Sequence, residues 1–272
     1  MVAAARLRRA QSRILSARPF AIKMRELLTD IAGRVVVKVE FPRPKDKNLE
    51  LHPLLQTNVS KKAALLLVTA DKGLCGSFNT NLLRRAAEVI QQNEGKEIKF
   101  FAAGRKGRDF LKRMGYTLSG EYLNIFNQLA YSHAEIIGGE LIHLYQKERF
   151  SEVLVIYNEF KSVIQQKLVV ERLLPVERPV KISSEQKIDY IFEPEKEKLL
   201  DALLPRCVKS HVFRILLESY AAELGARMTA MDSASKNASE LIDALTLKLN
   251  RTRQAIITRE IAELVGGAEA LK

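Results

Sequence analysis

Apolar residues recur at helical spacing along the last quarter of the chain. Between Pro205 and the glycine pair at 266–267 the sequence has no proline and one glycine, Gly225, so nothing forces a helix to end. The spacing is typical of a coiled-coil seam and predicts one long helix over 206–272, whose seam needs a partner helix or a socket in another protein. The seam positions step mostly by three and four: Leu217, Ala221, Leu224, Met228, Met231, Ala234, Ala238, Leu241, Leu245 and Leu249.

A second heptad pattern lies at the other end of the chain, within residues 1–40. The first twenty residues are rich in Arg, Ala and Ser and lack acidic residues, as in a mitochondrial transit peptide. The heptad pattern nevertheless passes Pro19 and any plausible cleavage site. We therefore expect a helix of the mature protein that pairs with the C-terminal helix. Its apolar positions are Leu7, Ala10, Ile14, Ala17, Ala21, Met24, Leu28 and Ile31.

Between these two segments, over 41–205, short apolar runs alternate with helical patterns. The alternation of strand and helix predicts a parallel, doubly wound sheet inserted between the two terminal helices. Residues 35–41 fit either a strand or the end of the first helix. Buried strands are expected at 63–70, 98–103 and 152–157, helices at 79–92, 105–114 and 134–147, and an antiparallel edge strand at 162–173.

Candidate chemistry is sparse. The glycine-rich turn at 71–76 follows a predicted strand and precedes a helix, but it matches neither common phosphate-binding motif, so a tight turn is favoured over nucleotide binding. Cys75 near the helix start fits either a thiol of lowered pKa or, preferably, a partly buried one. Cys207 and the histidines at 52, 133, 143 and 211 form no metal-type cluster. The sequence predicts no cofactor, no metal site and no independent active site.

The net positive charge of the chain indicates possible binding partners. The chain of 272 residues carries a net charge of +12, and from Met1 to Lys38 nine basic residues oppose two acidic ones. Such a field attracts nucleic acid, anionic lipid or an acidic protein surface, or it belongs to a solvated helix face. No apolar run is long enough to span a membrane. A basic coiled-coil module that binds nucleic acid or a membrane surface is therefore one functional hypothesis.

Polar residues interrupt the C-terminal seam near its end. Arg253 and Gln254 occupy positions where the seam would otherwise continue, and Thr258 follows one turn later. An arginine can bind a carboxylate through two parallel hydrogen bonds, and a glutamine can bond a backbone or hydroxyl group. The cluster fits either a solvated helix face or a docking point for another protein.

Nearly the whole chain resembles one family, the gamma subunits that form the central rotor stalk of F-type ATP synthases. The matching segments occur in the same order as in that family, which makes the resemblance more specific than any single motif. They are residues 1–11, 17–21, 71–82, 226–232, 238–249, 253–255, 257–258 and 260–271.

The resemblance implies an antiparallel coiled coil of both termini that carries a Rossmann-like α/β domain. It also implies a non-catalytic rotor that couples the rotation of a proton-driven membrane ring to conformational change in a hexamer of alpha and beta subunits, beside an epsilon subunit and with no nucleic acid. Three sets of partner contacts are implied: Arg253, Gln254 and Thr258 at the beta-subunit catch, Met1 and Arg227 at the level of the beta-subunit lever, and Tyr190, Phe192 and Glu193 at the membrane ring.

Two features depart from the family pattern. The family normally has about two dozen more residues before Met1, a basic heptad segment that continues the first helix, so the C-terminal helix beyond about Met231 is expected to lack an antiparallel mate in this chain. Arg259 stands where the family usually has glutamine, which alters one catch contact. The cysteine-bearing insertion of chloroplast forms is absent, which favours a bacterial protein on the cytoplasmic face of the inner membrane.

Overall fold

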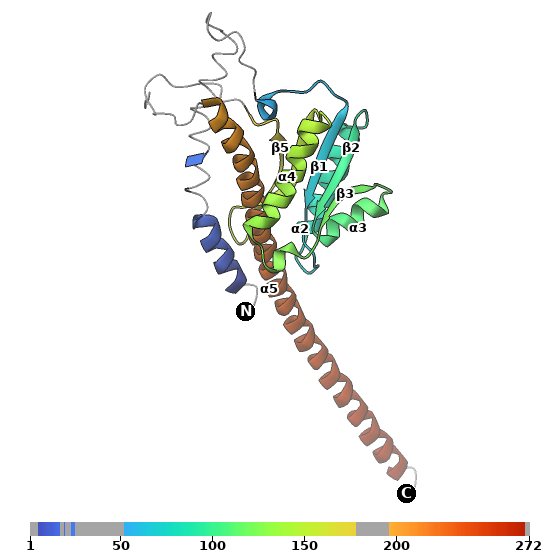
Figure 1. Ribbon diagram of the computed structural model, residues 1–272. Coiled ribbons are helices and arrows are strands. Elements are labelled where there is room, and N and C mark those ends of the chain that lie inside the picture. Colours follow the sequence, from blue (N-terminus) through green and yellow to red (C-terminus); the bar gives the residue numbers. More distant parts are fainter. Residues whose placement is uncertain (1–4, 17–18, 20–22, 25–51, 178–195, 270–272) are drawn as a thin grey trace, which may run out of the picture. The chain divides into compact units, whose positions relative to one another are not determined.

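The computed structural model describes residues 5–16, 19, 23–24, 52–177 and 196–269. The chain forms two compact units, 1–228 and 229–272. The first unit contains a sheet whose strand order is β3-β2-β1-β4-β5 (Figure 1). The strands are β1 (Lys62–Val68), β2 (Glu97–Ala103), β3 (Leu118–Tyr122), β4 (Glu152–Phe160) and β5 (Gln166–Leu174), and the helices are η1 (Pro53–Leu55), α2 (Phe78–Gln92), α3 (Arg105–Arg113), η2 (Ile125–Asn127), α4 (Tyr131–Lys147) and α5 (Lys196–Glu269).

The sheet is parallel apart from one edge. β1 pairs in parallel with β2 and with β4, and β2 pairs in parallel with β3. β5 pairs antiparallel with β4, as expected for the segment at 162–173. The fold class predicted from the sequence, a doubly wound α/β domain combined with long terminal helices, is confirmed.

Helices cover both faces of the sheet, which explains why β1 is a continuous apolar run. Leu66 and Val68 belong to a core that includes α4, the docked part of α5 and the N-terminal helix at 5–16. Leu65 and Leu67 point to the other core, which includes α2 and α3. Because successive strand side chains point to opposite faces, a strand buried on both sides is apolar at nearly every position, as β1 is from Ala63 to Val68.

The end of β1 and the start of α3 approach each other closely at Gly104. Its backbone has φ +109°, and a Cβ placed there would lie 2.1 Å from the backbone oxygen of Thr69. The Thr69 hydroxyl accepts a hydrogen bond of 2.8 Å from the Gly107 amide, and a carboxylate oxygen of Asp71 accepts one of 3.0 Å from the Arg105 amide. Two otherwise unsatisfied amides in the first turn of α3 are thereby bonded.

Helix α5 differs from its prediction at its start. It begins at Lys196 and passes through Pro205, so the predicted start at Arg206 is wrong. A proline inside a helix removes one backbone hydrogen bond, here the bond to the carbonyl of Asp201, which is on an exposed residue. Water can then solvate that carbonyl, so the helix continues. The three-part domain division at 40/41 and 205/206 stays a prediction.

Gly225 marks a close approach between α5 and the turn that joins β4 to β5. A Cβ at Gly225 would lie 3.1 Å from the carbonyl oxygen of Val163. Gly225, the one glycine between Pro205 and the pair at 266–267, therefore lies where the helix packs against a neighbouring backbone.

Candidate functional site

The first part of α5 is the element on which the rest of its unit is assembled. From Leu200 to Val212 its buried residues are spaced by four, which is the pattern of a helix docked by one face. From Ile215 to Gly225 every residue but Tyr220 is buried, so this stretch of the helix is covered nearly all round. The predicted seam is confirmed from Leu217 to Leu224, because Leu217 and Leu224 are each 2% exposed and Ala221 is fully buried. The other buried apolar positions are Leu200, Leu204, Val208, Val212, Ile215, Leu216 and Ala222.

The N-terminal helix at 5–16 packs into the same core. Leu7, Ala10 and Ile14 are buried at the predicted spacing. Figure 1 shows this helix running beside α5 in the opposite direction. The guanidinium of Arg13 donates a hydrogen bond of 3.1 Å to the Leu129 carbonyl, which ties this helix to the segment before α4. The predicted pairing of the two terminal helices is thus confirmed for the described residues of this unit.

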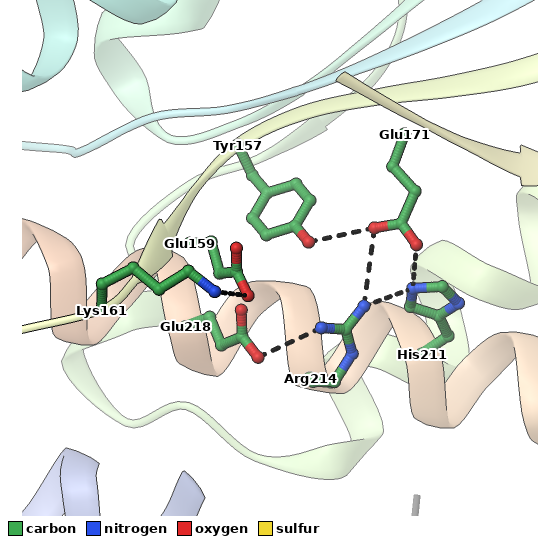
Figure 2. Close-up of polar contacts among 7 residues, drawn as sticks. All are labelled: Tyr157, Glu159, Lys161, Glu171, His211, Arg214 and Glu218. Carbon is green, nitrogen blue, oxygen red and sulfur yellow. Dashed lines mark hydrogen bonds and ion pairs between the residues drawn. The ribbon is translucent and has the colours of Figure 1, made fainter. Parts of the chain in front are cut away.

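A polar cluster joins α5 to the β4–β5 hairpin (Figure 2). Its centre is Glu171 on β5, whose carboxylate accepts a hydrogen bond of 3.0 Å from the Tyr157 hydroxyl of β4. One Glu171 oxygen lies 3.0 Å from His211 Nε2, and the other lies 3.5 Å from the Arg214 guanidinium. Arg214 also contacts Glu218 one turn further along α5, at 3.1 Å. Residues 211, 214 and 218 lie on one face of α5 because they are three and four positions apart.

The electrostatics of this polar cluster favour an ionised Glu171. Burial raises its pKa, but the hydrogen bond and charge of His211, the charge of Arg214 and the Tyr157 hydroxyl outweigh burial and lower the pKa to about 2. Burial also lowers the pKa of Arg214, while Tyr157, Glu218 and Glu171 raise it, with a net rise. Burial raises the pKa of Tyr157. The buried phenol therefore stays a neutral donor to a charged acceptor.

The glycine-rich turn lies against the last docked part of α5. Arg227 donates a hydrogen bond of 3.3 Å to the Gly73 carbonyl and lies 2.6 Å from the carboxylate of Glu223. Glu223 is 6% exposed, and burial raises its pKa although Arg227 opposes the rise. The turn therefore serves as a contact for α5.

Inside the turn, Asn79 and Cys75 bond to each other and to the backbone. The Asn79 side chain accepts a hydrogen bond of 3.0 Å from the Ala70 amide and donates one of 3.1 Å to the Cys75 sulfur. Cys75 is buried, and burial together with the charge of Glu223 raises its pKa. The hypothesis of a thiol of lowered pKa is wrong, whereas the buried thiol is confirmed.

The second unit is the helical continuation of α5, residues 229–269. Every residue from 229 to 268 is exposed except Ala230, which is half-buried. The seam residues Leu241, Leu245 and Leu249 are 60%, 56% and 67% exposed. Among the described residues, nothing covers this apolar seam. Large apolar side chains at this exposure along a helix indicate an interaction surface.

The predicted partner-contact residues fall into three groups. Arg253, Gln254 and Thr258 are exposed on the second unit and lie within about one and a half turns of the helix. Arg227 belongs to the first unit, where its guanidinium binds Glu223 and the turn. The remaining four, Met1, Tyr190, Phe192 and Glu193, lie outside the described residues.

The polar cluster around Glu171 was not predicted from the sequence. For His211, which lies in a helical pattern, a satisfied or surface histidine was favoured over a ligand, and no partner was predicted. A usable signal is the clustering of one His, one Arg and one Glu at helical spacing beside buried seam positions. Over the described parts of the chain, no group of His, Cys, Asp and Glu could hold a metal ion, and no helix is long and apolar enough to cross a membrane.

Comparisons with known proteins agree with this architecture. A family model described as ATP synthase matches residues 1–271. The chain is 44% identical over 272 residues to the ATP synthase gamma chain of Desulforamulus reducens, covering 100% of this chain and 91% of that protein. It is 42% identical over 271 residues to the gamma chain of Pelotomaculum thermopropionicum, with the same coverage.

Solved structures show the same fold. A chain of the central stalk and c-ring of the Tetrahymena thermophila mitochondrial ATP synthase aligns with a TM-score of 0.57 at 25% identity, covering 86% of this chain and 100% of that one. A chain of the Euglena gracilis mitochondrial ATP synthase aligns with a TM-score of 0.61 at 16% identity, covering 98% of this chain and 95% of that one, which supports the fold alone.

An α/β domain docked on a long helix whose far part keeps an exposed apolar seam defines the class of central stalk subunits of rotary ATP synthases. Within this class, the chain belongs to the ATP synthase gamma chain family. The family predicted from the sequence is confirmed.

Proposed function

We propose that this chain is the non-catalytic rotor of a bacterial proton-translocating ATP synthase. It turns inside a hexamer of alpha and beta subunits, binds an epsilon subunit and a membrane ring, and lies on the cytoplasmic face of the inner membrane. Rotation of the ring turns the chain, and the chain forces the catalytic sites of the hexamer through successive conformations.

The observation that carries this proposal is the contrast between the two parts of α5. Up to Leu224 most of its apolar residues are buried or half-buried against the sheet, α4 and the N-terminal helix, whereas from Met228 onward all the described ones but the half-buried Ala230 are exposed. The helix is continuous across this change, from Lys196 to Glu269. At about 1.5 Å per residue, residues 229–269 extend for about 60 Å. One part of the helix is thus anchored in a domain, and the other offers a long surface to other subunits.

A non-catalytic role fits the way the glycine-rich turn is used. Its polar groups bond to one another and to α5, through Asn79, Cys75 and Arg227. The burial of Cys75 raises its pKa, which disfavours the thiolate that a nucleophile would need. The turn therefore supports packing between β1, α2 and α5.

Arg253, Gln254 and Thr258 are the proposed contacts with the beta-subunit catch. They are exposed, and Arg253 has no acidic partner among the described residues, so its guanidinium can bind a carboxylate of another subunit. A desolvated Arg–carboxylate pair at an interface contributes several times more than an exposed one. Arg227 and Met1 are the proposed contacts at the level of the beta-subunit lever. Tyr190, Phe192 and Glu193 are the proposed contacts with the membrane ring.

Reconstitution tests the function directly. The chain is mixed with bacterial alpha and beta subunits that lack their own gamma subunit, the hexamer is fixed to a surface, and a bead is attached to an exposed residue of the sheet unit. We expect ATP-driven rotation in one direction, and no ATP hydrolysis by the chain alone. A hexamer that incorporates the chain and hydrolyses ATP without rotating it would overturn the proposal.

The catch contacts are tested by a matched pair of substitutions. Arg253→Ala removes the proposed contact, while Lys248→Ala removes an exposed basic side chain about 140° away around the helix and at least about 80° from Gln254 and Thr258. We expect Arg253→Ala to lower coupled ATP synthesis about tenfold, as for a lost interfacial charge pair, and Lys248→Ala to leave it nearly unchanged. Equal effects of both substitutions would contradict the contact.

A further inference from the structure

The polar cluster around Glu171 joins three elements that are far apart in the sequence. Tyr157 is on β4, Glu171 is on β5, and His211, Arg214 and Glu218 are on α5. Figure 2 shows the α5 side chains reaching toward the two strands. Among the described contacts between α5 and the sheet strands, this one is made through charged hydrogen bonds, whereas the surrounding contacts are apolar.

Apolar and polar contacts constrain a docked helix differently. Hydrophobic burial is non-directional, so small rotations of a helix about its axis change the buried area little. A charge-assisted hydrogen bond is directional and weakens steeply when its angle departs from linearity. The contacts of Glu171 with Arg214, at 3.5 Å, and with His211, at 3.0 Å, therefore oppose a change in the angle at which α5 faces the hairpin. Glu218, which lies on α5 itself, holds the Arg214 side chain in place.

His211 gives this cluster two hydrogen-bond arrangements. Its Nε2 lies 3.0 Å from Glu171 and 2.7 Å from the Arg214 guanidinium. One nitrogen cannot donate to a carboxylate and accept from a guanidinium at the same time. Either Nε2–H donates to Glu171, or a bare Nε2 accepts from Arg214. The pair of Glu171 and Arg214 is common to both arrangements.

We propose that Glu171 and Arg214 are positioning residues that transmit torque between the β4–β5 hairpin and α5. This inference rests on the proposed rotor function. When the sheet unit is driven against a load on the far part of α5, the apolar contacts tolerate a small twist and the Glu171–Arg214 contact opposes it. The pair thereby sets the torsional stiffness of the contact between α5 and the β4–β5 hairpin, which we call the joint.

Single-molecule rotation of the reconstituted complex measures this stiffness. The hexamer is fixed, and a bead is attached to a cysteine introduced at Met114, which is 53% exposed on the sheet unit. The joint then lies in the path between bead and hexamer. The variance of the bead angle during a catalytic pause is inversely proportional to torsional stiffness. Because only assembled complexes rotate, variants that do not fold are excluded from the measurement.

The expected results separate torque transmission from a general structural role. Glu171→Gln and Arg214→Ala should each widen the angular variance about twofold, since each removes a charge-assisted bond. Arg214→Lys, which keeps the positive charge but lacks the planar guanidinium group, should give an intermediate angular variance. Lys161→Ala is the matched control, because it breaks an ion pair of 2.8 Å with Glu159 that does not involve α5.

The outcomes of the two proposals can be told apart. A wild-type chain that assembles but does not rotate overturns the proposed function. If the wild-type chain rotates, and the Glu171→Gln and Arg214→Lys complexes show the same angular variance as the wild-type complex, this inference alone is overturned. If Glu171→Gln does not assemble, the comparison of Arg214→Lys with Lys161→Ala decides.

Discussion

Replacing Glu171 by glutamine should destabilise the first unit in a pH-dependent way. The substitution keeps the shape of the side chain but removes the charge that faces Tyr157, His211 and Arg214. The folded protein holds the pKa of Glu171 at about 2, against an ordinary value of 4.5. Each pKa unit corresponds to about 1.4 kcal/mol of differential stabilisation, so the charged form contributes about 3 kcal/mol. The side chain is 28% exposed, and solvent screening lowers this contribution to about 2 kcal/mol.

The sign of the pH dependence follows from the direction of the shift. A carboxyl group whose pKa is lowered by folding stabilises the folded state fully above its unfolded pKa, here about 4.5. That stabilisation is lost as the pH falls toward the folded pKa of about 2. The glutamine variant does not titrate at this position. The difference in unfolding free energy between wild type and variant should therefore be about 2 kcal/mol at pH 6 and should shrink below pH 4.5.

Urea denaturation at a series of pH values measures this difference. The chain contains no tryptophan, so the fluorescence of its seven tyrosines reports the unfolding of the first unit. Glu159→Gln provides the control, since its partner Lys161 is 49% exposed and such a surface pair contributes less than about 1 kcal/mol. A difference that stays constant from pH 7 to pH 3, or a loss at pH 6 no larger than that of the control, would refute the reasoning.

Three further predictions concern other contacts of the same unit. Gly104→Ala should lower the unfolding free energy measured by urea denaturation by about 3 kcal/mol or more, because the new Cβ would meet the Thr69 carbonyl oxygen at 2.1 Å. The matched Gly139→Ala in α4 has open space around its new Cβ and should raise the unfolding free energy by up to about 1 kcal/mol. Equal effects of the two substitutions would contradict the argument. In a variant whose only cysteine is Cys75, the thiol should react with a thiol reagent at least about tenfold more slowly in the native chain than in urea. The reason is that Cys75 is buried and its pKa is raised. Equal rates would show an accessible thiolate. Arg227→Ala should cost about 3 kcal/mol at pH 7, because it leaves the buried Glu223 carboxylate without its partner at 2.6 Å. Burial already raises the pKa of Glu223 above its ordinary value of 4.5, so the stability of the Arg227→Ala variant should fall as the pH rises above 4.5. The double variant with Glu223→Gln should recover much of the loss and remove that pH dependence.

Hydrophobic spacing was sufficient to predict most of the fold. The apolar run at 63–70 could be recognised because both faces of β1 are covered, and the steps from Leu217 to Leu224 because one face of α5 is buried. β3 was not predicted. It lies at an edge, contains a glycine and two polar residues, and none of its residues is fully buried, so neither a continuous nor a strongly alternating apolar pattern marks it.

Other features depend on tertiary contacts that local sequence does not encode. Pro205 indicated a helix boundary because a proline normally ends a helix, yet the docking of residues on both sides, such as Leu204 and Val208, keeps α5 continuous. The polar cluster needs Tyr157 and Glu171 to be brought together by the register of β4 against β5, in which Tyr157 pairs with Val169 and Val155 with Glu171. A shift of one residue would place Glu171 on the opposite face of the sheet.

The close approach at Gly225 limits how this helix can be made stiffer. Glycine inside a helix usually costs about 1 kcal/mol relative to alanine, so an engineer would choose Gly225→Ala to rigidify α5. Here the new methyl carbon would lie 3.1 Å from the Val163 carbonyl oxygen, so the turn of the hairpin that carries Glu171 would have to give by a few tenths of an ångström. A substitution that increases the bending rigidity of the helix at this residue therefore weakens its packing against the sheet unit. A variant selected for a stiffer helix should show weaker contacts between α5 and the β4–β5 hairpin.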